Sequence, residues 1–118
     1  MIKAYSRRKL QRTQSGRMML LRNLTESLIL SEKIVTTLPK AKELKRFFDK
    51  IMTSAKLGGI TGFRRVNVHI KDKQVSKKIF EILVPRYTDR NSGLTQIFKL
   101  PKPRQGDAAS MCIIKLVQ

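Results

Sequence analysis

The clearest pattern of apolar and polar positions along the chain lies in residues 38–56. Apolar side chains recur there every three or four positions, which is typical of one face of an α-helix. Pro39 fits the first turn, where its missing N–H has no intrahelical partner, and Gly58-Gly59 is a natural left-handed stop. The pattern predicts a helix over 38–56 with Phe47 in the core, together with Ala41, Leu44, Phe48, Ile51, Met52 and Ala55.

Two further helices are predicted. Over 15–31 the apolar residues Leu21, Leu24 and Leu28 have helical spacing, and Ser15 is a candidate N-cap. Over 73–84 Asp72 can cap the helix, and we expect Pro85 to end it. The residues expected to point inward from this second helix are Val75, Ile79, Ile82 and Leu83.

Three short segments have the character of strands. They are 34–37, which is β-branched, 95–100 and 111–117, and the last two predict an antiparallel hairpin with a long basic connection over 101–109. Cys112 falls on the apolar side of the final strand and is expected in the core. Residues 60–71 are ambiguous, because Val66, Val68 and Ile70 alternate as in a strand while Thr61 can cap a short helix. Propensity slightly favours a strand.

These elements predict an α+β fold with two layers. A small mixed sheet of about three strands carries helices packed on one face. Residues 1–14 are basic and polar without apolar periodicity, so we interpret them as an arm that precedes a single domain over 15–118.

The charge of the chain changes this picture most. The 118 residues contain 26 lysines and arginines against 8 acids, which gives a net charge of +18. Such self-repulsion disfavours the compact state unless a polyanion neutralises it. A basic balance of this size makes nucleic acid the leading partner. Aromatic residues are only 6% of the chain, so base stacking is not expected to be the main binding device.

Other classes of function find little support in the sequence. Since no apolar run reaches 18 residues, no membrane span is expected. A single cysteine and a single histidine, Cys112 and His69, exclude an internal disulfide and a multi-Cys zinc site. The run Gly58-Gly59-Ile60-Thr61-Gly62 lacks the Gly-Lys-Ser/Thr ending of a P-loop. We therefore predict no enzyme, no cofactor and no small-molecule substrate.

The basic residues supply the candidate RNA contacts. Arginine is favoured in such an arm because its planar fork matches phosphate geometry. Lys40 and Lys42 lie at a helix start, which also presents free N–H groups and a positive dipole end. The loop arginines are expected to face solvent or RNA. The full candidate set is Lys3, Arg7, Arg8, Lys9, Arg12, Arg17, Arg22, Lys40, Lys42, Arg86, Arg90 and Arg104. Tyr87 can either stack on a base or pack against a helix end.

Several separated blocks resemble the bacterial large-subunit ribosomal protein L17 family. The clearest match is Thr36-Thr37-Leu38-Pro39-Lys40-Ala41-Lys42-Glu43-Leu44, and further matches are Leu21-Arg22-Asn23-Leu24, Pro85-Arg86-Tyr87 and Arg104-Gln105-Gly106-Asp107-Ala108-Ala109. The chain departs from the family pattern at Gly16, Leu94, Gln96 and Lys115, where His, Tyr, Arg and Glu are expected.

The resemblance implies a two-layer fold in which residues 60–71 are helical, and we follow it there against propensity. It also implies a structural role on large-subunit ribosomal RNA, beside neighbouring ribosomal proteins and near the polypeptide exit region. The implied location is the cytoplasm, with an organellar ribosome left open. The alternative is a DNA-binding protein of the nucleoid type, although the sequence shows no helix-turn-helix with a readable recognition helix.

Overall fold

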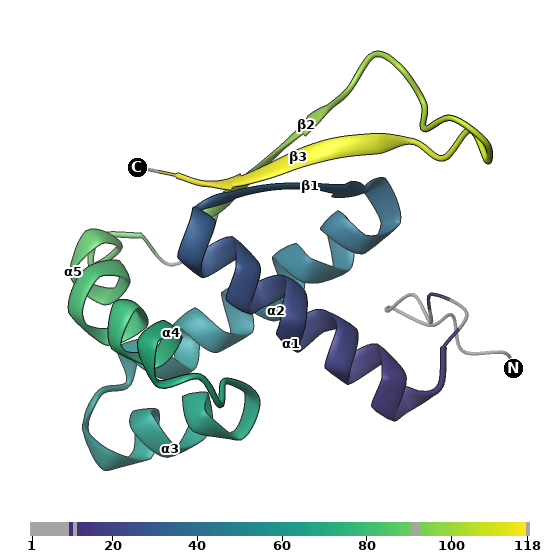
Figure 1. Ribbon diagram of the computed structural model, residues 1–118. Helices are drawn as coiled ribbons and strands as arrows, with labels where there is room; N and C mark the ends of the chain where they lie inside the picture. Colours follow the sequence, from purple (N-terminus) through teal and green to yellow (C-terminus); the bar gives the residue numbers. More distant parts are fainter. Residues whose placement is uncertain (1–9, 11, 91–92, 118) are drawn as a thin grey trace, which may run out of the picture.

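A computed structural model describes residue 10 and residues 12–90 and 93–117 (Figure 1). The described elements follow one another as α1 (Gln14–Ser31), β1 (Lys33–Thr37), α2 (Leu38–Lys56), α3 (Gly59–His69), α4 (Lys73–Lys78), a π-helical turn η1 (Ile79–Leu83), α5 (Val84–Arg86), β2 (Thr95–Lys99) and β3 (Met111–Leu116). The strands form one layer and the helices pack beneath it, so the predicted α+β fold with helices on one face is confirmed.

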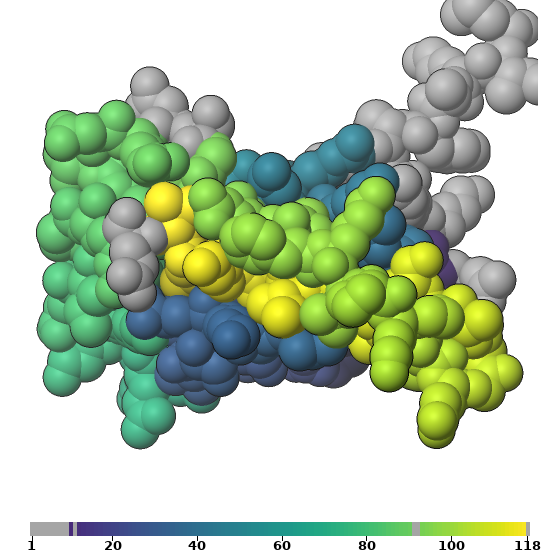
Figure 2. Space-filling model, turned by 90° about the horizontal axis from the view of Figure 1, so that it is seen from above, coloured from purple at the N-terminus to yellow at the C-terminus, as the bar shows by residue number. Residues whose placement is uncertain are grey.

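The sheet has the strand order β1-β3-β2, and β3 is antiparallel to both neighbours. The expectation of a mixed sheet was therefore wrong in this detail, while the hairpin of β2 and β3 is confirmed. Cys112, Ile114 and Leu116 are buried against the helices. Their alternation along β3 is the period of two that a half-buried strand requires. Figure 2 shows the other face of β2 and β3 at the surface of the molecule.

Helix α2 has the bounds that its apolar periodicity predicts, and it contributes more to the core than any other element described. Every apolar residue expected on its inner face is buried, including Leu44 and Phe48, and Phe47 lies beside them. Glu43 is also buried, and its carboxylate lies 3.7 Å from the guanidinium of Arg46 one turn later. The prediction of an amphipathic core helix is confirmed.

Helix α1 begins one residue earlier than expected, and its N-cap is Thr13 rather than Ser15. The Thr13 hydroxyl accepts a hydrogen bond from Gly16 N–H at 3.2 Å, which satisfies one of the free amides of the first turn. The predicted border between arm and helix at residue 14 therefore shifts slightly toward the N-terminus. Leu21, Leu28 and Ile29 are buried and attach α1 to the core.

Residues 60–71 are largely helical, as the family resemblance implied and as strand propensity did not. In a strand Val66 and Val68 would lie on the same face. Val66 is fully buried and Val68 is 56% exposed, so the two valines lie on different faces, as in a helix. Gly62 explains the close packing of α3 on the end of α2, because a Cβ there would lie 2.8 Å from the carbonyl oxygen of Ser54. Gly58, with φ of 71°, makes the sharp change of direction between the two helices.

The expectation that Pro85 ends the helix predicted over 73–84 was wrong. In an α-helix a proline ring clashes with the carbonyl four residues earlier and leaves it without a donor. Here the register changes just before the proline: Val84 N–H donates to the carbonyl of Ile79, five residues back. A π-turn of this kind absorbs the disturbance, and helical geometry continues to Arg86. The change also leaves Ile82 at the surface, 47% exposed, although it was predicted to be inward.

Candidate nucleic-acid interface

The start of α1, the start of α2 and the loop between β2 and β3 lie toward the same end of the molecule (Figure 1). We call this part the basic end. Leu38 N–H at the start of α2 donates to the carbonyl of Ser110 at 2.9 Å, which fixes the loop beside that helix. The candidates Arg12, Arg17, Lys40, Lys42 and Arg104, which are far apart in sequence, belong to these three segments.

Both helix starts at the basic end carry cations where a helix favours anions. The first turns of α1 and α2 contain no acidic residue, although the N-terminus of a helix has a positive partial charge. Arg17 reaches back to donate to the carbonyl of Arg12 at 3.4 Å, and Lys40 and Lys42 lie in or beside the first turn of α2. Free amides and cations together make an environment that an anion would stabilise.

The loop at the basic end is shaped by an internal ion pair. Arg104 donates through Nε to Asp107 Oδ1 at 3.0 Å and through a second nitrogen to the other carboxylate oxygen. These bonds, and the Ala109 N–H that the same carboxylate accepts, lower the pKa of Asp107 to about 2. An RNA phosphate would have to compete with Asp107 for Arg104. Lys102, in the same loop, is also exposed.

Arg22 lies away from the helix start, in a second group of positive charges contributed by α1, α2 and the segment that follows α3. Burial lowers the pKa of His69, and the nearby charges of Arg22, Lys50 and Lys71 lower it further. Arg22 Nε and His69 Nδ1 are both buried without a hydrogen-bond partner among the described residues. Sequence reasoning missed Lys50, His69 and Lys71 as members of this group, because only the packing of three helices brings them close to Arg22.

The two candidate arginines Arg86 and Arg90 lie at the opposite end, around α5 (Figure 1). Arg86 forms an ion pair with Glu32, the C-cap of α1, and hydrogen bonding to this arginine lowers the pKa of Glu32. Arg90 donates to the carbonyl of Gly93 at 3.3 Å. Arg86 thereby connects α5 to the end of α1, whereas the Arg90 bond lies within one loop. Sequence reasoning assigned neither role.

Tyr87 belongs to the core rather than to the surface. Its ring is 1% exposed, and its hydroxyl donates to the carbonyl of Val117 just after β3. Of the two interpretations left open, packing is the one that the structure shows. The arm candidates Lys3, Arg7, Arg8 and Lys9 lie outside the described residues.

The described part of the chain contains no group of three His, Cys, Asp or Glu residues that could hold a metal ion. Across the same residues, no helix combines the length and the apolarity needed to cross a membrane.

Comparison with known proteins decides the family. The family model described as ribosomal protein L17 matches residues 20–117. The chain belongs to the ribosomal protein L17 family. A relative from Endomicrobium trichonymphae, named large ribosomal subunit protein bL17, is 50% identical over 99% of both chains. Relatives of the same name from Alkaliphilus metalliredigens and Campylobacter jejuni are 46% identical over 93% of this chain and over 96% and 93% of their own.

Two of the four departures from the L17 family pattern lie opposite each other in the sheet. Gln96 on β2 pairs with Lys115 on β3, so two positions at which the resemblance led us to expect arginine and glutamate are cross-strand neighbours. The ammonium of Lys115 lies 5.2 Å from the centre of the Phe98 ring instead, within the range of a cation–π contact. Leu94 is buried where a tyrosine is expected, and Gly16 donates to the cap of α1.

Proposed function

We propose that this protein is a structural constituent of the large ribosomal subunit that binds and neutralises ribosomal RNA through its basic end. Its place in the large subunit, within the cytoplasm, follows from membership of the L17 family and from relatives named for that subunit. This family is structural rather than enzymatic, which agrees with the prediction of no enzyme.

The observation that carries the RNA-binding proposal is the arrangement of charge at the basic end. Two helix N-termini and a basic loop converge there, and their first turns carry lysine and arginine without acids. Each of these features is unfavourable in isolation, because like charges repel and a cation opposes the helix dipole. RNA phosphates bound at the basic end would reduce the repulsion between its cations and would interact favourably with both helix N-termini.

The finer location is also part of the proposal. By resemblance to its family we place the protein near the polypeptide exit region, in contact with neighbouring large-subunit proteins as well as RNA. Photo-cross-linking from position 42 in assembled subunits would identify the RNA segment that α2 contacts. A cross-link to RNA remote from the exit region would contradict this location.

Sedimentation with purified large subunits tests the function itself. We expect the full chain to co-sediment with large subunits lacking their own copy, and excess duplex DNA not to displace it. A Lys40→Ala/Lys42→Ala variant should co-sediment more weakly. Lys33→Ala serves as the matched control, because Lys33 is exposed and lies at the start of β1, away from the basic end. Equal partition of the native protein into DNA would favour the nucleoid-type alternative.

A further inference from the structure

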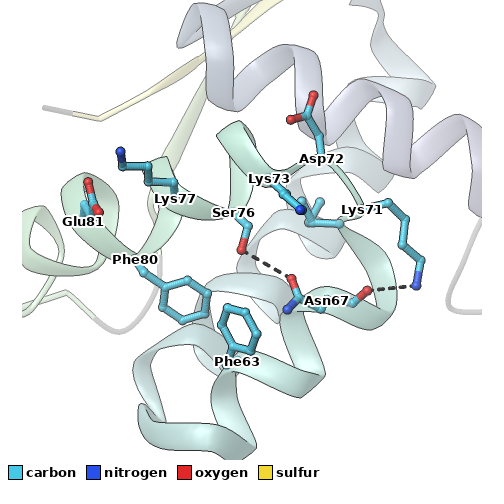
Figure 3. A pocket seen from close by; sticks show the side chains of 10 residues that line it. Phe63, Asn67, Lys71, Asp72, Lys73, Ser76, Lys77, Phe80 and Glu81 are labelled. Atoms are coloured by element: carbon cyan, nitrogen blue, oxygen red, sulfur yellow. Dashed lines mark hydrogen bonds between the residues drawn. The ribbon is translucent and has the colours of Figure 1, made fainter.

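A groove of about 610 Å³ lies between α3 and the segment formed by α4 and η1 (Figure 3). It is separate from the basic end, and none of the candidate RNA contacts predicted from the sequence lines it. Its floor includes the buried Ile70, and its walls present Phe63 from α3 and Phe80 from η1. Several of its lining residues are exposed, including Phe63, Lys73 and Lys77, so the groove is accessible from solvent.

The apolar walls of the groove are aromatic. The centres of the Phe63 and Phe80 rings are 5.7 Å apart and their planes are tilted by 36°. Phe63 is 52% exposed, so about half of this residue remains accessible for a further contact. A planar group placed on the free part of the Phe63 ring would extend this pair into a stack.

A fixed amide lies beside the two rings. The Ser76 hydroxyl donates to Asn67 Oδ1 at 3.3 Å, and the backbone carbonyl of Asn67 accepts the ammonium of Lys71 at 3.0 Å (Figure 3). The first bond orients the side-chain amide with its oxygen toward Ser76. Its NH₂ group, which carries two donors, is thereby directed away from Ser76 and is available to read acceptors on the edge of a bound ring.

The rim of the groove favours an anionic ligand. Three lysines border it, Lys71, Lys73 and Lys77, against Asp72 and Glu81. The carboxylate of Asp72 already caps α4 by accepting Gln74 N–H at 2.8 Å. Lys73 and Lys77 are four residues apart on α4, so they lie on one face, about 6 Å from each other at Cβ.

We propose that this groove receives an unpaired base of ribosomal RNA, which stacks on Phe63 while the flanking phosphates contact Lys73 and Lys77. The inference rests on the proposed RNA-binding function and adds to it a contact that reads a base rather than the backbone. An acidic protein segment would also suit the lysines. The observations favour the base, because the exposed apolar surface is aromatic and the amide of Asn67 offers the donors that a base edge requires.

Binding of two short fluorescein-labelled RNAs to the full chain tests this proposal. One is a single-stranded oligoadenylate, and the other carries abasic riboses at its central positions. We expect Phe63→Ala to weaken oligoadenylate binding about five- to a hundredfold, the range for loss of one stacked base, and to leave abasic RNA binding nearly unchanged. Phe63→Leu should lose almost as much, since leucine keeps apolar area without a ring face.

Phe98→Ala is the matched control. Phe98 is 48% exposed and lies beside the ammonium of Lys115, but it belongs to β2. Native oligoadenylate affinity in Phe63→Ala, full rescue by Phe63→Leu, or an equal loss in Phe98→Ala would overturn the groove assignment. A Phe63→Ala variant that binds RNA normally but no longer binds other large-subunit proteins would assign the groove to a protein segment. Only an absence of salt-dependent RNA binding in the native chain would also remove the proposed function.

Discussion

The two ends of the molecule use the same residue types for different purposes. Around α5, Arg86 pairs with Glu32 and Arg90 bonds a carbonyl three residues away, so both side chains have partners within the protein itself. At the basic end, Arg17, Lys40 and Lys42 lie in or beside the first turns of helices, and these first turns contain no acid. Arg104 is an exception at the basic end, because it pairs with Asp107. The difference teaches that net charge identifies the class of partner, while the internal partners of each cation indicate which cations remain available to it.

The largest expected effect concerns salt. If the basic end and the arm together neutralise about six to ten phosphates, RNA affinity should fall on the order of a thousandfold or more between roughly 50 and 200 mM salt. Fluorescence anisotropy with a ribosomal RNA fragment over this range measures it. A nearly flat log–log plot would remove the electrostatic basis of the comparison between the two ends.

The next effect separates core positions of α2 from its charged surface. Phe48 is fully buried, so Phe48→Ala should lower the free energy of unfolding by about 3–5 kcal/mol. Lys40→Ala/Lys42→Ala should change it by less than about 0.5 kcal/mol per residue. Urea denaturation followed by circular dichroism gives both values, and similar losses in the two variants would mean that the helical phase is wrong.

A direct comparison of the two ends follows from the slope of the salt plot. Each lysine that contacts a phosphate contributes about one unit to that slope. We expect Lys40→Ala/Lys42→Ala to reduce it by about two, and Arg86→Ala/Arg90→Ala to reduce it clearly less. If the second variant has the larger effect, the ion pairs around α5 do not keep those arginines from RNA.

The ion pair near α5 should make a smaller, pH-dependent contribution to stability. Because Arg86 holds the pKa of Glu32 below its usual 4.5, the stabilisation is present above that value and is lost as pH falls through the folded-state pKa. Both side chains are about one-third exposed, so Arg86→Ala should cost less than about 1 kcal/mol near neutral pH. Thermal melting should show the gap between native and variant proteins closing as the solution is acidified below about pH 5.

The smallest effect is a shift in one titration. His69 is the only histidine, so its imidazole proton resonances can be followed by NMR without assignment of others. In the free protein we expect its pKa below 6.5, since burial and three cations disfavour the imidazolium. A phosphate bound among Arg22, Lys50 and Lys71 would raise it. An unchanged titration with RNA bound would exclude this group from the interface.

The sequence predicted an element correctly where the spacing of its own apolar residues marks the buried face. The 3,4 spacing of apolar residues fixed the bounds of α2, and alternation identified β3. It failed at Pro85 because a π-turn changes the hydrogen-bond register without leaving a sign in residue type. The valines of α3 favoured a strand by propensity for a related reason. Propensity describes the backbone conformation that a residue type prefers, and it does not show which side chains pack against α2.

Within the candidate site, the residue types were predictable and their partners were not. Glu32 and Arg86 are 54 positions apart, and nothing along the chain connects them. The same holds for Phe63 and Phe80, which the sequence places on separate helices and the fold places ring beside ring.

The strand order has a consequence for how the protein is made. The middle strand, β3, is the last of the three in the chain, and it pairs residue 33 with residue 115. During synthesis the helices can form early, but neither β1 nor β2 finds its partner until residues 111–116 have emerged. Such distant pairing slows folding, so we expect a newly made chain to remain for some time as helices without a sheet, with its cations already accessible to RNA.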